Sequence, residues 1–141
     1  MNEHTPPVPL QIVVIEDNPA DVLLIREALK EQGLEFILRV IEDGQEAVTF
    51  ACREENLDRA TLPDLIVLDL NLPKYSGKEI LKCLRESTEL AQAPVAILTS
   101  SDLPQDRLDA ARLGANRYIR KPVTLEEFMQ VGAILKELLA R

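Results

Sequence analysis

The sequence predicts an α/β fold, a doubly wound five-stranded parallel sheet with five helices. Short apolar runs alternate strictly with longer amphipathic runs along the chain. The short runs are rich in Val, Ile and Leu on both faces, which is typical of parallel strands that helices cover on both sides. A chain of 141 residues is about the size of one domain and can bury a core without disulfides or metal ions. We therefore expect a flexible tail over residues 1–9 and one domain over residues 10–141.

Each strand is followed by a segment with helical periodicity and recognisable end signals. The first strand spans residues 10–15, and Asn18, Pro19 and Gly33 suit the N-cap, the first position and the end of the helix that follows. The second strand spans residues 36–41 and precedes a helix that Asp43 caps. The remaining strands are expected at 65–70, 94–98 and 117–119, and the remaining helices begin at Ser76, Pro104 and Thr124. The polar segment 53–63 either extends the second helix or forms a loop.

Composition excludes some classes of partner. The net charge of −8 argues against nucleic acid or an anionic membrane, because both attract a basic surface. No apolar run is long enough to span a bilayer, and the N-terminal residues lack a leader-like apolar run. We expect His4 to be a solvated tail residue, and Cys52 and Cys83 to be small buried hydrophobic residues rather than a redox pair. A reducing, cytoplasmic location fits these features.

Polar residues follow the predicted strands at the point where each strand ends. The carboxyl ends of parallel strands meet at one edge of a sheet, which is where such folds place their sites. Taken singly, an acidic pair there usually starts a helix, a threonine is usually structural, and Lys-Pro usually forms a turn. Their convergence favours a functional site instead. The residues are Glu16 and Asp17 after the first strand, Asp69 after the third, Thr99 after the fourth, and Lys121 after the fifth.

Three carboxylates at one edge need a cation. Each pair about 4 Å apart costs roughly 4 kcal/mol at an effective dielectric constant of about 20. Oxygen ligands favour Mg²⁺ or Mn²⁺, and a magnesium site with few protein ligands typically works together with a phosphate. The sequence therefore predicts phosphoryl transfer, with Asp69 as nucleophile and with Thr99 and Lys121 binding phosphoryl oxygens.

The same residues resemble the receiver domain of two-component response regulators. The resemblance covers about residues 10–139. Glu16-Asp17, "DLNLPKYSGKEIL" around Asp69, "AIL" before Thr99, and "GANRYIRKP" ending in Lys121-Pro122 carry it. It implies a flavodoxin-like fold with the strand order 2-1-3-4-5.

The resemblance also implies roles for individual residues. Asp69 becomes the phosphoacceptor, so the chain is expected to be a phosphoprotein of a two-component phosphorelay that catalyses only its own phosphorylation and dephosphorylation. Thr99 and Tyr118 are expected to move together as a switch. The implied metal ligands are Glu16, Asp17, Asp69 and the backbone carbonyl of Asn71, the implied phosphoryl-binding residues are Thr99 and Lys121, and the bond before Pro122 is expected to be cis.

Two positions depart from the common receiver pattern. Glu16 stands where many receivers have aspartate, and its longer arm suits a metal contact through water. Ser100 stands where alanine is common, which affects the lifetime of the phosphoryl group in a direction that the sequence does not give.

A narrower resemblance links the chain to stand-alone regulators paired with bacterial phytochrome kinases. "VIEDNPADVLLIREALKEQG", the long segment before Pro63 and "DLNLPKYSGKEIL" carry it. It implies a sensor histidine kinase as partner, and a homodimer through the face formed by the fourth helix, the fifth strand and the fifth helix. Because the sequence ends soon after the fifth predicted helix, we expect output through another protein, onward phosphotransfer or dimerisation.

Rival functions remain at this point. A phosphorelay intermediate would pass its phosphoryl group to a histidine phosphotransfer protein. An aspartate-based phosphohydrolase typically has its nucleophile after the first strand and an acid two residues later, where this chain has Asn71. A receiver-like module that is never phosphorylated would be expected to have lost a site residue. A flavodoxin-type cofactor binder lacks support, because Glu16 and Asp17 would repel a phosphate.

Overall fold

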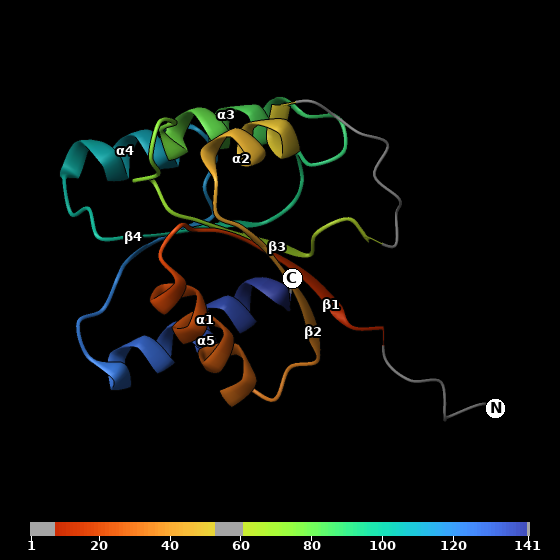
Figure 1. Cartoon of the computed structure of the whole chain (residues 1–141), viewed down its shortest axis with the longest axis vertical. Coiled ribbons are helices and arrows are strands. Elements are labelled where there is room, and N and C mark those ends of the chain that lie inside the picture. The colour runs from red at the N-terminus through yellow and green to blue at the C-terminus, as the bar shows by residue number, and fades with distance from the viewer. Residues whose placement is uncertain (1–7, 53–60, 141) are drawn as a thin grey trace.

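The computed structural model describes residues 8–52 and 61–140. It contains five strands and five helices in alternation within that part of the chain (Figure 1). Residues 1–7 of the tail expected over residues 1–9, and residues 53–60 of the polar segment 53–63, lie outside the described residues. In chain order the elements are β1 (Leu10–Ile15), α1 (Pro19–Glu31), β2 (Phe36–Ile41), α2 (Gly44–Cys52), β3 (Leu65–Leu68), α3 (Gly77–Glu86), β4 (Val95–Thr99), α4 (Pro104–Arg112), β5 (Arg117–Arg120) and α5 (Leu125–Leu139).

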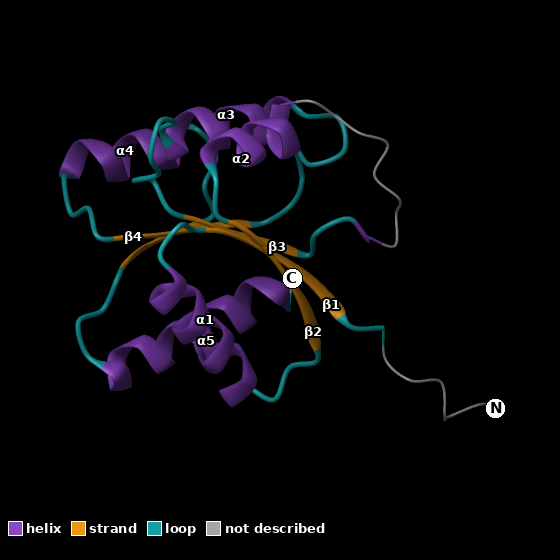
Figure 2. Cartoon of the chain, in the orientation of Figure 1, coloured by secondary structure: helices purple, strands orange, loops and turns teal. Residues whose placement is uncertain are grey.

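The strands form one parallel sheet in the order β2-β1-β3-β4-β5, which confirms the predicted topology. Helices α1 and α5 cover one face, and α2, α3 and α4 cover the other (Figure 2). Every residue of β3 and β4 is buried, as expected for strands that are covered on both faces. None of the described helices is long and apolar enough to cross a membrane.

Helix ends follow the predicted capping residues. The Asn18 side chain accepts a hydrogen bond from the Ala20 amide at 2.9 Å, and the Asp43 side chain accepts one from Gln45 at 2.6 Å. Ser76 and Thr124 cap α3 and α5 in the same way. These bonds satisfy amides that have no partner within the helix, so each helix begins where its sequence signal lies.

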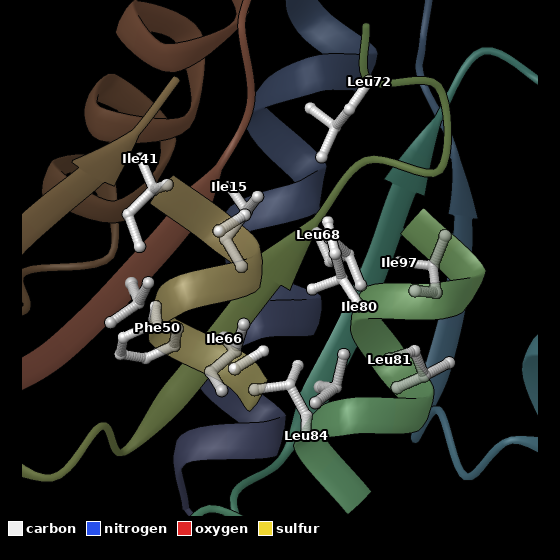
Figure 3. Close-up of a cluster of buried hydrophobic side chains, with 14 of the residues drawn as sticks. Ile15, Ile41, Phe50, Ile66, Leu68, Leu72, Ile80, Leu81, Leu84 and Ile97 are labelled. Carbon is white, nitrogen blue, oxygen red and sulfur yellow. The ribbon is translucent and has the colours of Figure 1, made fainter. Parts of the chain in front are cut away.

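Two apolar clusters fill the space on either side of the sheet. The cluster beneath α2 and α3 joins Phe50 and Leu84 to the inward side chains of β1, β3 and β4 (Figure 3). The second cluster lies between the sheet and the α1–α5 pair, and it includes Ile25, Phe128 and Leu135. Every buried side-chain nitrogen or oxygen in the described residues has a hydrogen-bond partner. The core therefore fixes the sheet without buried polar defects.

The expectation for the cysteines is wrong. Cys52, which is exposed, and Cys83, which is half-buried, form a disulfide between the end of α2 and the middle of α3. Their sequence separation of 31 residues gives no sign of pairing, but α2 and α3 lie side by side and bring the two Cα atoms to 5.0 Å. That distance is within the range that a disulfide spans.

Packing of α1 against α5 depends on a close approach at Gly132. A Cβ atom at this position would lie 2.3 Å from the backbone oxygen of Ala28. Gly132→Ala should therefore destabilise the protein by about 1–3 kcal/mol through overpacking, although alanine alone favours a helix by up to about 1 kcal/mol.

Urea denaturation measures this change directly. The exposed neighbour offers a control, because Ala133→Ser touches no helix interface and should change stability by less than about 0.5 kcal/mol. Unchanged or increased stability of Gly132→Ala would contradict the close packing of α1 and α5.

Candidate functional site

The carboxyl ends of β1, β3 and β5 bring three of the predicted site residues into direct contact. Lys121 Nζ lies 2.8 Å from Glu16 Oε1 and 2.9 Å from Asp69 Oδ2. Glu16 and Asp69 are buried, with only 2% and 4% of their surfaces exposed. One ammonium group therefore holds two buried carboxylates that come from different strands.

Backbone hydrogen bonds that continue past the strand ends set this geometry. The Glu16 amide donates to Ile41 and the Asp69 amide donates to Ile15, both at 3.0 Å. The Lys121 amide donates to the Thr99 carbonyl at 2.7 Å. The parallel hydrogen-bond pattern therefore continues one residue beyond these strands, which places the side chains of Glu16, Asp69 and Lys121 at the same edge of the sheet.

The site contains a fourth acidic residue, Asp21, which was not predicted from the sequence. Asp21 Oδ2 lies 2.7 Å from Lys121 Nζ, which is as close as either predicted partner. Asp21 lies in the first turn of α1, three residues after the Asn18 cap. The available signal for Asp21 was its position in the first turn of the predicted helix. That turn comes directly after the acidic pair and faces the strand ends.

Burial and charge shift the titration of two groups. Burial raises the pKa of the Glu16 carboxyl to about 7; the hydrogen bond from Lys121 opposes this rise, and the nearby charge of Asp69 adds to it. Burial lowers the pKa of the Lys121 ammonium, but hydrogen bonds to Asp21, Glu16 and Asp69 outweigh it, so the net pKa lies above its ordinary value. Lys121 is therefore a fixed positive charge, and Glu16 is a carboxyl that burial makes easier to protonate.

Three of the carboxylates are arranged so that they could hold a metal ion. Glu16, Asp17 and Asp69 each offer an oxygen, and these oxygens lie within 4.8 Å of one another. Asp17 is exposed, which leaves the cluster open to solvent on one side. An all-oxygen set open to water suits a hard divalent cation such as Mg²⁺ or Mn²⁺ better than a soft metal.

The remaining predicted residues lie beside this cluster. Thr99 is fully buried at the end of β4, and its hydroxyl oxygen accepts from the Asn71 side chain at 3.3 Å and from the Ser101 amide at 3.4 Å. Asn71 also donates its backbone amide to Asp69 Oδ1 at 3.0 Å. Thr99 is thus linked to Asp69 through Asn71.

Tyr118 is held on β5 by two contacts. Its hydroxyl donates to the Ser101 carbonyl at 3.0 Å, and the guanidinium of Arg107 lies 4.4 Å from the centre of its ring. Such a cation–π contact contributes about 0.5–1 kcal/mol at an exposed site. Ser101 therefore connects Thr99 with Tyr118, because its amide donates to the Thr99 hydroxyl and its carbonyl accepts from the Tyr118 hydroxyl.

The expectation of a cis bond before Pro122 is wrong. The described residues contain no cis peptide bond, so Lys121–Pro122 is trans. The trans form is intrinsically favoured by about 0.5–1 kcal/mol even before proline. With this trans bond Lys121 donates its amide to Thr99, and its ammonium reaches all three carboxylates.

The chain is similar to known proteins in sequence and in fold. The family described as "Response regulator receiver domain" matches residues 12–132. Response regulator Rcp1 of Synechocystis is 32% identical over 131 residues, which cover 93% of this chain and 88% of that protein.

Solved structures of similar proteins also match the fold. The phosphorylated cyanobacterial phytochrome response regulator RcpA is 34% identical with a TM-score of 0.82, and the match covers 94% of each chain. The Mn²⁺-bound form of Rcp1 is 31% identical with a TM-score of 0.79, over 92% of this chain and 93% of that one. The receiver domain of the Pseudomonas aeruginosa sensor histidine kinase PA1611, with magnesium in its active-site cleft, is 26% identical with a TM-score of 0.72, over 94% of this chain and 99% of that one.

Replacing Lys121 tests the charge arrangement of the cluster. Lys121→Met leaves the buried carboxylates without their cation, so in EDTA the free energy of unfolding should fall by about 3 kcal/mol or more. Mg²⁺ should restore part of this loss, because a bound cation stabilises the folded state by mass action.

Thermal or urea unfolding with and without Mg²⁺ measures both effects. Lys136→Met removes an exposed lysine of α5 and should leave stability within about 0.5 kcal/mol of the unmodified chain. A Lys121→Met protein as stable as this control in EDTA would show that the ammonium does not hold the carboxylates together.

Proposed function

The chain belongs to the response regulator receiver domain family, and we propose that it accepts a phosphoryl group on Asp69 from a sensor histidine kinase. The observation that carries this proposal is the contact between the Asp69 carboxylate and the Lys121 ammonium, beside two further carboxylates at the sheet edge. The similarity to RcpA, whose structure was solved in the phosphorylated form, supports it.

We propose Mg²⁺ as the cofactor, with Mn²⁺ able to replace it. Glu16, Asp17, Asp69 and the backbone carbonyl of Asn71 would hold the ion, and the spacing of the three carboxylates supports this assignment. The Mn²⁺-bound and Mg²⁺-containing structures of similar receivers point the same way. Bound there, a divalent cation supplies positive charge that offsets the charge of the phosphoryl oxygens.

The residues of this chain act on the incoming phosphoryl group in defined ways. A carboxylate oxygen of Asp69 attacks phosphorus as the bond between phosphorus and the donor's histidine nitrogen breaks, and the nitrogen keeps the bonding electron pair. Lys121 then exchanges part of its contact with Asp69 for a phosphoryl oxygen. The Thr99 hydroxyl turns from Ser101 and Asn71 to donate to another phosphoryl oxygen. Both groups thus stabilise charge that appears only when phosphorus is bound.

The bonds at Ser101 support a switch that involves Thr99 and Tyr118. When the Thr99 hydroxyl turns toward the phosphoryl group, it releases the Ser101 amide. The Ser101 carbonyl accepts a hydrogen bond from the Tyr118 hydroxyl, so a shift of Ser101 alters the position in which Tyr118 is held. Phosphorylation would therefore shift the population of the α4-β5-α5 face between two arrangements.

We propose that this face carries the output, through a second copy of the chain. Apolar side chains are exposed just before α4, within α4, just before α5 and at the first residue of α5. They are Leu103, Leu108, Val123 and Leu125. A phytochrome kinase is the proposed partner upstream, because similar regulators are described as phytochrome response regulators. The proposed location of the chain is the cytoplasm.

Two alternatives use the same site. A phosphorelay intermediate would pass the phosphoryl group from Asp69 to a histidine phosphotransfer protein, and it would share every step above. An aspartate-based phosphohydrolase is disfavoured because Asn71, two residues after Asp69, cannot donate a proton as a carboxylic acid can. We therefore propose that the chain turns over no substrate other than its own phosphoryl group.

Phosphorylation of Asp69 is tested with a small phosphodonor. Incubation with acetyl phosphate and Mg²⁺ should add the mass of one phosphoryl group to the intact chain, and neither EDTA-treated protein nor Asp69→Asn should gain it. Asp102→Asn, which changes an exposed aspartate paired with Arg120, should be phosphorylated like the unmodified chain. No gain of mass under any condition, or equal gain by Asp69→Asn, would reject the assignment.

The switch and the dimer are tested together by light scattering. With Mg²⁺ and beryllofluoride, a phosphoryl mimic, the unmodified chain should shift toward the mass of a dimer, whereas Tyr118→Ala should not. Leu23→Ala, an exposed change on α1, should respond like the unmodified chain. A chain that stays monomeric with the mimic would contradict the dimer, and a Tyr118→Ala protein that responds normally would contradict the switch.

A further inference from the structure

We propose that Cys52 and Cys83 form a reversible redox modification site, which couples the thiol–disulfide state of the surroundings to the loop that follows Asp69. The two residues are the only cysteines of the chain, and they lie on adjacent helices with their Cα atoms 5.0 Å apart. Cys52 ends α2 and is exposed, while Cys83 is half-buried against the core. The disulfide thus has one accessible sulfur and one protected sulfur.

A purely structural role does not account for this bond. The domain buries an extensive apolar core on both faces of its sheet, and chains of this size do not need a disulfide to fold. In the cytoplasm, which we propose as the location of the chain, disulfides are usually transient and catalytic or redox-sensing. The inference therefore rests on the proposed function for the setting in which the bond works.

The chemistry needs only a small disulfide or a small thiol as the second reactant. On oxidation, the Cys52 thiolate attacks a low-molecular-weight disulfide and releases one thiolate, which leaves a mixed disulfide on Cys52. The Cys83 thiolate then attacks Cys52 Sγ and releases the second thiolate. Two protein thiols lose two electrons and two protons, and the small disulfide gains both. Reduction reverses these steps and begins at the exposed sulfur of Cys52.

The two bonded helices both contact the loop between β3 and α3. At the other end of α2, the Gln45 side chain accepts a hydrogen bond from the Tyr75 hydroxyl at 2.9 Å, and Gly44 packs against Pro73. α3 begins directly after this loop, and its Gly77 amide donates to Leu70 at 3.0 Å. The disulfide fixes α2 relative to α3, so it also fixes the two supports of the loop.

That loop leads directly to the metal and phosphoryl site. Its residue Asn71 donates to Asp69 Oδ1 and to the Thr99 hydroxyl. Lys74, in the middle of the loop, has a φ of 70°, which is uncommon for a residue other than glycine and persists only where surrounding contacts hold it. Oxidation should therefore preorganise the loop, and reduction should loosen it. A preorganised loop binds a cation more tightly, because less ordering is needed on binding.

Two measurements on the full chain test the proposal. In buffers that range from reduced to oxidised glutathione, mass spectrometry after thiol alkylation should show a reversible change between two alkylated cysteines and none. Calorimetric titration with MgCl₂ should then give a dissociation constant at least about threefold lower for the oxidised chain than for the reduced chain.

The double variant Cys52→Ser, Cys83→Ser provides the matched control, because it can form neither this bond nor a mixed disulfide and should bind Mg²⁺ like the reduced chain in either buffer. The redox site would be overturned if both cysteines could still be alkylated after incubation with oxidised glutathione. It would also be overturned if thiols did not reduce the disulfide in the folded protein. Equal Mg²⁺ affinity of the two forms would overturn its coupling to the loop. Neither readout involves phosphoryl transfer, so a failure of the proposed function gives a different result from a failure of this inference.

Discussion

The ammonium of Lys121 is the constraint on which the site depends. It lies within 2.9 Å of three carboxylates, those of Glu16, Asp21 and Asp69, which come from two strand ends and a helix. Unpaired carboxylates this close would repel one another by several kcal/mol at an effective dielectric constant of about 20. A single cation therefore allows negative charge to accumulate at the edge of the sheet where we propose that a second cation and a phosphoryl group bind. Burial is the main cause of the raised pKa of Glu16, and the nearby charge of Asp69 adds to the rise.

Most of the fold and much of the site follow from patterns in the sequence. Buried apolar runs gave the strands because a parallel sheet must be covered on both faces, and Asn18, Ser76 and Thr124 marked helix starts because their side chains satisfy free amides. Glu16 and Lys121 could be placed together because parallel strands end at one edge. The third strand ends two residues earlier than predicted, since Leu70 instead accepts a hydrogen bond from the amide of Gly77.

Other features depend on tertiary geometry that a one-dimensional pattern does not encode. The Cys52–Cys83 bond requires that α2 and α3 lie side by side, which no spacing along the chain reveals. Asp21 lies in the first turn of α1, and only the orientation of α1 decides that it faces Lys121. The bond before Pro122 was expected to be cis by resemblance alone, and the structure has it trans. Asp21 and Pro122 lie at the site, whereas the disulfide lies at the far end of α2, with Cys83 packed against the core.

We propose that Lys121 exchanges carboxylate partners for a phosphoryl group while Glu16, Asp17 and Asp69 hold a cation. The most direct test is a crystal structure of the chain with Mg²⁺ and beryllofluoride. We predict beryllofluoride on Asp69, the ion among the three carboxylates, and Lys121 Nζ bonded to a fluoride. A structure without an adduct on Asp69, in which Lys121 keeps all three of its present carboxylate partners, would contradict the account.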